Sequence, residues 1–291
     1  MSISFSEKDA LLLEKLNRRS WSHSFSPESD IDWGSSTTPE EYRALYDAWS
    51  LLLGTRHEAA LNDEQCIRFA KYQQMNLMMG TAIFERYALA NFESLYGDDS
   101  NPAYQEYVSH LIKEETYHYV LFARANERIA ESDPELRALP FRPFKIYLAV
   151  VLFMLRYVPS RRMRHGMFFY LLRFIEEITL QANSMTKKTI ARGDSLVLRV
   201  WELHAIDEAR HVAFDDLMMR NARFPGVWGK IPGWLTIPLC IGASLLINLN
   251  EIWAARQLGV RVGYHELPML MKKTTAPFKR KVFNLLFNSA P

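Results

Sequence analysis

The stretch that decides the fold runs from Trp201 to His211 and reads WELHAIDEARH. Within it, His204, Glu208 and His211 follow one another at intervals of four and three residues. A helix would place these three side chains on one stripe of its surface. The flanks favour a helix, because no Pro or Gly occurs between positions 194 and 224 and apolar residues recur there at helical spacing. The stretch therefore predicts a helix with one metal-binding face.

A shorter version of the pattern occurs upstream, where Glu115 and His118 lie three residues apart in KEETYH (113–118). Carboxylate-bridged two-metal bundles take a Glu-x-x-His pair from each of two helices and a single Glu from each of two others. The two patterns supply half of such a set. Two single glutamates are still required.

Candidates for the single glutamates lie about one helix upstream of each pattern. Glu85 precedes Glu115 by 30 residues, and Glu177 precedes Glu208 by 31 residues. The chain thus carries a weak internal repeat of two helix pairs. Glu176 is the alternative to Glu177, and the nearly equal interval favours Glu177.

The charge of this set requires cations, because buried carboxylates without compensating charge are costly. Mixed oxygen and nitrogen ligands suit iron or manganese better than tetrahedral zinc. Glu93, two turns after Glu85, is an alternative ligand on the first helix. We predict two metal ions, iron (Fe2+ or Fe3+) or manganese, with Glu115 and Glu208 as bridges. The full ligand set is Glu85, Glu115, His118, Glu177, His204, Glu208 and His211.

An additional acid precedes each bridging glutamate. Glu114 comes before Glu115, as Asp207 comes before Glu208. Metal-bound histidines commonly donate their second ring N–H to a carboxylate, which fixes the tautomer and the ring orientation. We therefore expect Asp207 to contact His118, and Glu114 to contact His211.

The composition limits the classes of protein to which the chain can belong. The chain has 291 residues, of which 48% are hydrophobic, and this is enough to bury one large core. A net charge of +2 gives no sign of a nucleic-acid partner. Cys66 and Cys240 are isolated thiols, which favours a reducing compartment. The amino terminus lacks the apolar run of a secretory signal, so a cytoplasmic location is expected.

Strand patterning is almost absent, so the fold class is all-α, an elaborated four-helix bundle. We expect an N-terminal arm over 1–38. Its residues 11–16 can form a short amphipathic helix that docks on the bundle, and residues 21–39 form an irregular segment pinned by Trp21, Phe25, Ile31 and Trp33. A bundle domain over 39–260 and a C-terminal tail over 261–291 that packs on or extends it should follow. The expected helices are 41–53, 62–96, 102–131, 144–158, 160–192, 195–222 and 235–258.

One apolar stretch is long enough to be considered as a membrane-spanning helix. Residues 231–250 carry no charge, but Pro and Gly interrupt them. The interruptions favour a buried packing helix over a membrane span. Membrane association is the less favoured alternative.

The seven ligand positions together resemble the p-aminobenzoate N-oxygenase (AurF-like) family of non-haem di-iron oxygenases. The distinguishing residue is His204, one imidazole more than the six ligands of most ferritin-like oxygenases. The arm sequence SPESDIDW (26–33) is also similar to the family's N-terminal segment, and the resemblance covers residues 20–255. It implies a ferritin-like bundle with additional N- and C-terminal helices.

The resemblance also implies a reaction. Family members use ferrous iron and O2 to oxidise an amine to a hydroxylamine, nitroso or nitro product in specialised-metabolite pathways. The amine can be free or tethered to a carrier. The chain has no flavin or iron–sulfur motif, so a separate reductase is expected, and a homodimer is expected as well. The alternatives are a di-iron hydroxylase acting at carbon, a ferritin-like iron-oxidising storage protein, and a helical protein whose acids only form salt bridges.

Overall fold

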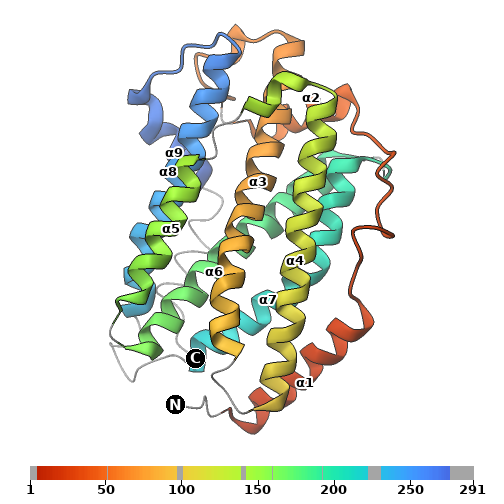
Figure 1. Cartoon of the computed structure of the whole chain (residues 1–291). Coiled ribbons are helices and arrows are strands. Elements are labelled where there is room, and N and C mark those ends of the chain that lie inside the picture. The colour runs from red at the N-terminus through yellow and green to blue at the C-terminus, as the bar shows by residue number, and fades with distance from the viewer. Residues whose placement is uncertain are drawn as a thin grey trace.

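The computed structural model describes residues 5–50, 52–96, 101–138, 142–158, 160–191, 193–221 and 231–275. Nine α-helices account for most of this part of the chain, which contains no strand (Figure 1). They are α1 (Glu7–Ser22), α2 (Pro39–Trp49), α3 (Asp63–Tyr96), α4 (Pro102–Glu131), α5 (Arg142–Arg156), α6 (Arg161–Thr189), α7 (Leu196–Asn221), α8 (Ile231–Gln257) and α9 (Leu267–Thr275).

Local sequence explains where several helices begin. The Thr38 side chain accepts from the Glu41 backbone N–H at 3.3 Å, and Glu41 accepts from the Thr38 N–H at 2.8 Å, so α2 starts with a capping box. Asn101 caps α4 through the Tyr104 N–H, and Pro102 fits the first turn because it needs no N–H partner there. These signals make most helix starts readable from sequence.

The bundle consists of α3, α4, α6 and α7. Chain neighbours pack as hairpins, α3 against α4 and α6 against α7, and α4 contacts α7 between the two hairpins (Figure 1). The expected all-α bundle is therefore confirmed. The remaining helices are arranged around it, with α1 against α4 and α7, α2 against α3, and α5 and α8 against each other.

Two apolar clusters form the core, and the polar site lies between them. Along α4, residues 104–111 belong to one cluster and residues 121–130 to the other. Along α7, residues 214–219 belong to the same cluster as residues 104–111, and residues 196–203 belong to the same cluster as residues 121–130. The segments 114–118 and 204–211 therefore form a polar layer that is closed by apolar packing at both ends.

The N-terminal arm contains α1 and an irregular segment that packs on the bundle. Phe25 and Ile31 are buried, at 4% and 6% exposure. Trp21, in contrast, is 71% exposed, although its Nε1 donates to Glu106 at 2.9 Å. The Trp21 ring also lies edge-on to His110 of α4, with ring centroids 4.7 Å apart, so Trp21 contacts the bundle as expected although most of its surface is exposed.

Helix α8 includes the uncharged stretch and continues through Pro238 to Gln257. It packs against α3, α5, α6 and α9. In the described part of the chain, no helix combines the length and the apolarity that a bilayer span requires. Of the expected tail, α9 is observed, and positions 276–291 lie outside the described residues.

Candidate metal centre

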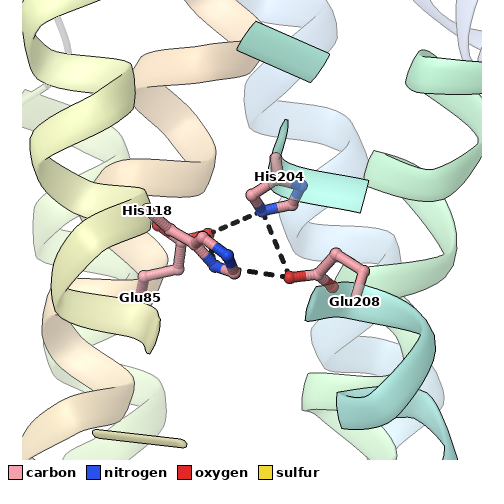
Figure 2. Close-up of side chains that lie close together, drawn as sticks. All are labelled: Glu85, His118, His204 and Glu208. Carbon is pink, nitrogen blue, oxygen red and sulfur yellow. Dashed lines mark hydrogen bonds and ion pairs between the residues drawn. The ribbon is translucent and has the colours of Figure 1, made fainter. Parts of the chain in front are cut away.

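Four side chains from three helices converge in a first group of possible ligands (Figure 2). Glu85 of α3, His118 of α4, and His204 and Glu208 of α7 each offer an atom that lies within 4.8 Å of the others. Nε2 of His204 lies 3.1 Å from Glu85 Oε1 and 3.2 Å from Glu208 Oε1. The side chain of Glu93, the alternative to Glu85, lies outside the described residues.

A second group overlaps the first. Glu115, His118, Glu208 and His211 also offer atoms within 4.8 Å of one another. Nδ1 of His211 lies 3.2 Å from Glu115 Oε1 and 3.4 Å from Glu208 Oε1. Because His118 and Glu208 belong to both groups, the structure contains two adjacent positions for a cation. This arrangement fits a centre with two bridged ions.

Each of two imidazoles faces the cluster with one nitrogen and an outer acid with the other. Nε2 of His118 lies 3.4 Å from Asp207 Oδ2, and Nε2 of His211 lies 2.9 Å from Glu114 Oε2. Both contacts expected from the sequence are therefore present. A neutral His211 that donates to Glu114 through Nε2 keeps its Nδ1 lone pair directed at the cluster. The longer contact between His118 and Asp207 is not a hydrogen bond in this structure.

Sequence reasoning missed Arg210, which joins the two outer acids. Its guanidinium donates to Glu114 at 2.7 Å and also to Asp207, and its Nε donates to Ser20 of α1 at 3.1 Å. Burial would lower the pKa of Arg210, but the two carboxylates outweigh this effect and raise it. The sequence did contain one signal for this contact. A cationic residue directly before His211, on a helix that is buried, requires a nearby acid as its counter-charge.

Glu176 and Glu177 are both buried and differ in their partners. Glu177 pairs with Arg173 one helical turn earlier, at 2.6 Å. Glu176 is buried, and burial together with the nearby charges of Asp215 and Glu208 raises its pKa well above the usual range. Neither converging group of four includes either residue, but the electrostatic contact with Glu208 favours Glu176 over the residue chosen by interval.

Burial and neighbouring charges shift the pKa values of the cluster residues in different directions. Burial, followed by the charge of Glu115, raises the pKa of Glu85. Burial also lowers the pKa of His204, and the nearby His118 and His211 lower it further. Burial would raise the pKa of Glu115 as well, yet contacts with His118 and His211 bring it to about 2. These buried carboxylates repel one another and cannot all ionise together. Bound cations would relieve this repulsion.

Unpaired atoms provide a direct test of whether metal ions fit. Buried polar atoms in proteins nearly always have partners. Here seven buried atoms of the predicted ligands have no hydrogen-bond partner, and four of them are imidazole nitrogens. They are Glu85 Oε2, Glu115 Oε2, Glu208 Oε2, His118 Nδ1, His118 Nε2, His204 Nδ1 and His211 Nδ1. Oxygen and nitrogen donors of this kind fit iron or manganese.

Aromatic rings surround the cluster. Phe25 of the arm stacks nearly parallel on His118, with ring centroids 5.8 Å apart and planes at 12°. Phe122 lies 4.7 Å from His204 on the side of one apolar cluster. Trp201 is fully buried, and its Nε1 donates to Gln74 at 3.0 Å. These rings exclude water from the centre, which strengthens electrostatic interactions inside it.

Comparisons with known proteins agree with this geometry. A family model described as P-aminobenzoate N-oxygenase AurF matches residues 6–230. A solved R2-like ligand-binding oxidase with an aerobically reconstituted Mn/Fe cofactor is similar in fold, with a TM-score of 0.59 and 15% identity over 96% of this chain and 94% of that one. A valine-to-isoleucine mutant of an R2-like ligand-binding oxidase gives a TM-score of 0.53 and 16% identity over 96% of this chain and 95% of that one. No curated protein matches in sequence. The similarity confirms the ferritin-like architecture.

Proposed function

The chain belongs to the p-aminobenzoate N-oxygenase AurF family, and we propose that it uses two iron ions and O2 to oxidise an amine at nitrogen. Family membership and the buried cluster of carboxylates and imidazoles support an oxidase with a two-metal centre. The choice of iron, the amine substrate and a role in specialised metabolism are parts of the proposal.

The position of His204 is the observation that carries the proposal. Its Nε2 lies within 3.2 Å of oxygen atoms from both Glu85 and Glu208, inside the group of converging atoms. A third imidazole beyond two Glu-x-x-His pairs is the feature that resembles the N-oxygenases. An additional neutral nitrogen donor adds electron density to a metal without adding charge.

The proposed ligands divide between two positions. Glu85 and His204 would hold one ion, Glu115 and His211 the other, and Glu208 lies within reach of both positions as the expected bridge. Glu115, the other bridge expected from the sequence, belongs to one group only, and Nδ1 of His118 would bind one of the two ions. Glu176 replaces Glu177 as the carboxylate that α6 contributes. When bound, the iron pair would supply the electrons and the open coordination positions that O2 activation requires.

The chain's own residues orient and protect this centre. Asp207 and Glu114 hold the Nε2 sides of His118 and His211, and Arg210 holds both acids. Such outer contacts fix imidazole orientation and ligand basicity. Phe25 and Phe122 cover imidazole faces and limit the access of water.

The overall reaction has a defined balance. An amine, O2, two electrons and two protons give a hydroxylamine and one water, so the N–O bond forms while the second oxygen atom is reduced. The electrons must come from outside, which requires a separate reductase. The substrate amine can be free or attached to a carrier, and the protein is proposed to act as a homodimer.

Anaerobic loading with Fe2+, followed by metal counting and exposure to O2 with an amine panel, tests the proposal. The expected result is two irons per chain and an amine product 16 mass units heavier on nitrogen. His204→Ala should abolish this product, whereas Glu202→Ala, a half-buried acid on the same helix, should leave it unchanged. Oxygen incorporation at carbon would favour a hydroxylase instead. Accumulation of oxidised iron as a mineral would favour a storage protein.

A further inference from the structure

The outer face of α5 is an uncovered apolar stripe. Five large apolar side chains recur at helical spacing and are 50–70% exposed, whereas the opposite face of the same helix is buried in the core. A helix that is apolar all round is normally covered on every side. The exposed residues are Ile146, Val150, Phe153, Met154 and Tyr157, and the buried ones are Leu148, Val151 and Leu155.

The stripe is held firmly by α8. Gly242 of α8 approaches Tyr147 of α5 so closely that a Cβ at position 242 would lie 2.7 Å from the tyrosine ring. Ile241, next to this contact in sequence, is 53% exposed. The two helices lie side by side at one edge of the molecule (Figure 1), and the first 20 residues of α8 carry no charge. The uncovered face is therefore part of a rigid surface.

The sequence around the stripe carries charge of one sign. Residues 136–175 contain eight Lys or Arg residues and no Asp or Glu, although one of them, Arg173, is buried and paired with Glu177 and Asp216. Lys145 and Arg156 are exposed at the two ends of the stripe. A partner that covers this face would therefore be anionic and apolar.

A second copy of the chain fits this face poorly. In a symmetric dimer each patch meets the same patch of the other copy. An antiparallel pairing of two α5 helices would bring Lys145 next to Arg156 of the other copy, and like charges across an interface are costly. The homodimer expected for the protein would use another surface.

A folded acidic protein also fits less well than lipid. Protein interfaces carry about one hydrogen bond per 100–200 Å². The described side chains that are exposed between Lys145 and Arg156 cannot form hydrogen bonds, and they are Ile146, Ala149, Val150, Phe153 and Met154. Lipid acyl chains require no such bonds.

We propose that the outer face of α5 docks the protein onto an anionic phospholipid surface. The helix lies parallel to the surface, the stripe enters the boundary between headgroups and acyl chains, and Lys145 and Arg156 contact lipid phosphates. The sequence disfavoured a membrane span at residues 231–250 and gave no signal for docking through α5. Docking on one leaflet needs no span, and it does not depend on the chemistry of the metal centre.

Flotation of the full-length protein with lipid vesicles tests the proposal. Vesicles of phosphatidylglycerol should carry the protein upward, and vesicles of phosphatidylcholine alone should carry much less. The double variant F153S/M154S should lower binding by about tenfold or more, because two apolar side chains no longer enter the lipid. V150S/Y157S should act in the same way, and a thermal melt of each variant verifies that it is folded.

Matched controls separate the stripe from general surface effects. L11S/M269S removes exposed apolar side chains elsewhere, at 58% and 39% exposure, and should bind as the wild type does. K145E/R156E should lower binding about tenfold, whereas K8E/K15E, at exposed positions of α1, should change it much less. Absent or charge-independent vesicle binding would overturn the proposal. The proposal would also be overturned if light scattering showed that F153S/M154S dissociates a dimer while vesicle binding stays unchanged.

Discussion

The guanidinium of Arg210 donates to the carboxylate of Glu114 across the contact between α7 and α4, at a distance of 2.7 Å. Both side chains are almost fully buried, and the same guanidinium also holds Asp207. One cation thus offsets two acids that sit behind the predicted ligands. The stability and the metal affinity of the protein should both depend on this arrangement.

Replacement of Arg210 by Leu should destabilise the metal-free protein by about 3–5 kcal/mol, because two buried acids lose their counter-charge. Urea unfolding with circular dichroism measures this loss. Arg43→Leu provides the control, since its pair with Asp47 is half exposed and should contribute less than about 1 kcal/mol. Equal losses in the two variants would show that Arg210 is not a structural counter-charge.

Neutralising either outer acid should weaken metal binding while the ligands remain in place. Asp207→Asn and Glu114→Gln should each lower the affinity for Fe2+ by about 10- to 100-fold, because the imidazoles lose orientation and basicity. Competition with a chelator of known affinity measures the change. Asp47→Asn, at an exposed position, should have no effect. Unchanged affinity in both outer variants would contradict this role.

Glutamine substitutions in α6 distinguish the two adjacent glutamates. Glu176→Gln should reduce metal occupancy, because this side chain lies close to the charges of Glu208 and Asp215. Glu177→Gln should retain the metal and lose the pair with Arg173. Metal counting after gel filtration measures occupancy. Loss of metal in Glu177→Gln alone would restore the sequence-based choice.

Metal loading should stabilise the protein, because bound cations relieve repulsion among the buried carboxylates. At a free metal concentration about 1,000 times Kd, the gain should be about 4 kcal/mol. Binding should also release protons, since Glu85 has a raised pKa and gives up its proton to act as a ligand. Melting curves with Fe2+ and with a chelator, and a pH-indicator dye, measure the two effects. Identical melting curves would argue against a metal centre.

Glu251 should make stability depend on pH. Burial raises its pKa from 4.5 to about 7, although Asn76 donates to it at 3.2 Å. Between these values the folded protein keeps a proton that the unfolded chain has lost, so stability falls as the pH rises through this window. Glu251→Gln should therefore stabilise the protein by about 3 kcal/mol at pH 8 and by little at pH 4.5. A gain that does not depend on pH would contradict this account.

Helix type and position could be predicted from the sequence because local signals act within one turn. The cap at Asn101 and Pro102 placed the start of α4 correctly, and the spacing of His204, Glu208 and His211 identified the ligand stripe of α7. The fold class followed from the absence of strand patterning.

The side chain that a helix turns toward its neighbours could not always be predicted in the same way. Adjacent residues on a helix differ by about 100° in direction, so a repeat interval that is uncertain by one residue cannot choose between Glu176 and Glu177. The rotation of α6 against its neighbours decides which one faces inward. Arg210 was missed because two of its partners, Glu114 and Ser20, lie on other helices. The exposed face of α5 was missed because apolar residues predict burial but do not identify a partner.

The stacking of Phe25 on His118 has a practical consequence for handling the protein. An affinity tag fused ahead of α1 leaves this ring in place, whereas trimming the gene to the four bundle helices would remove both Phe25 and Ser20, the α1 partner of Arg210. A shortened version would expose one imidazole to solvent and loosen the salt network behind it. Such a fragment would be a poor sample for metal reconstitution even if it remained helical.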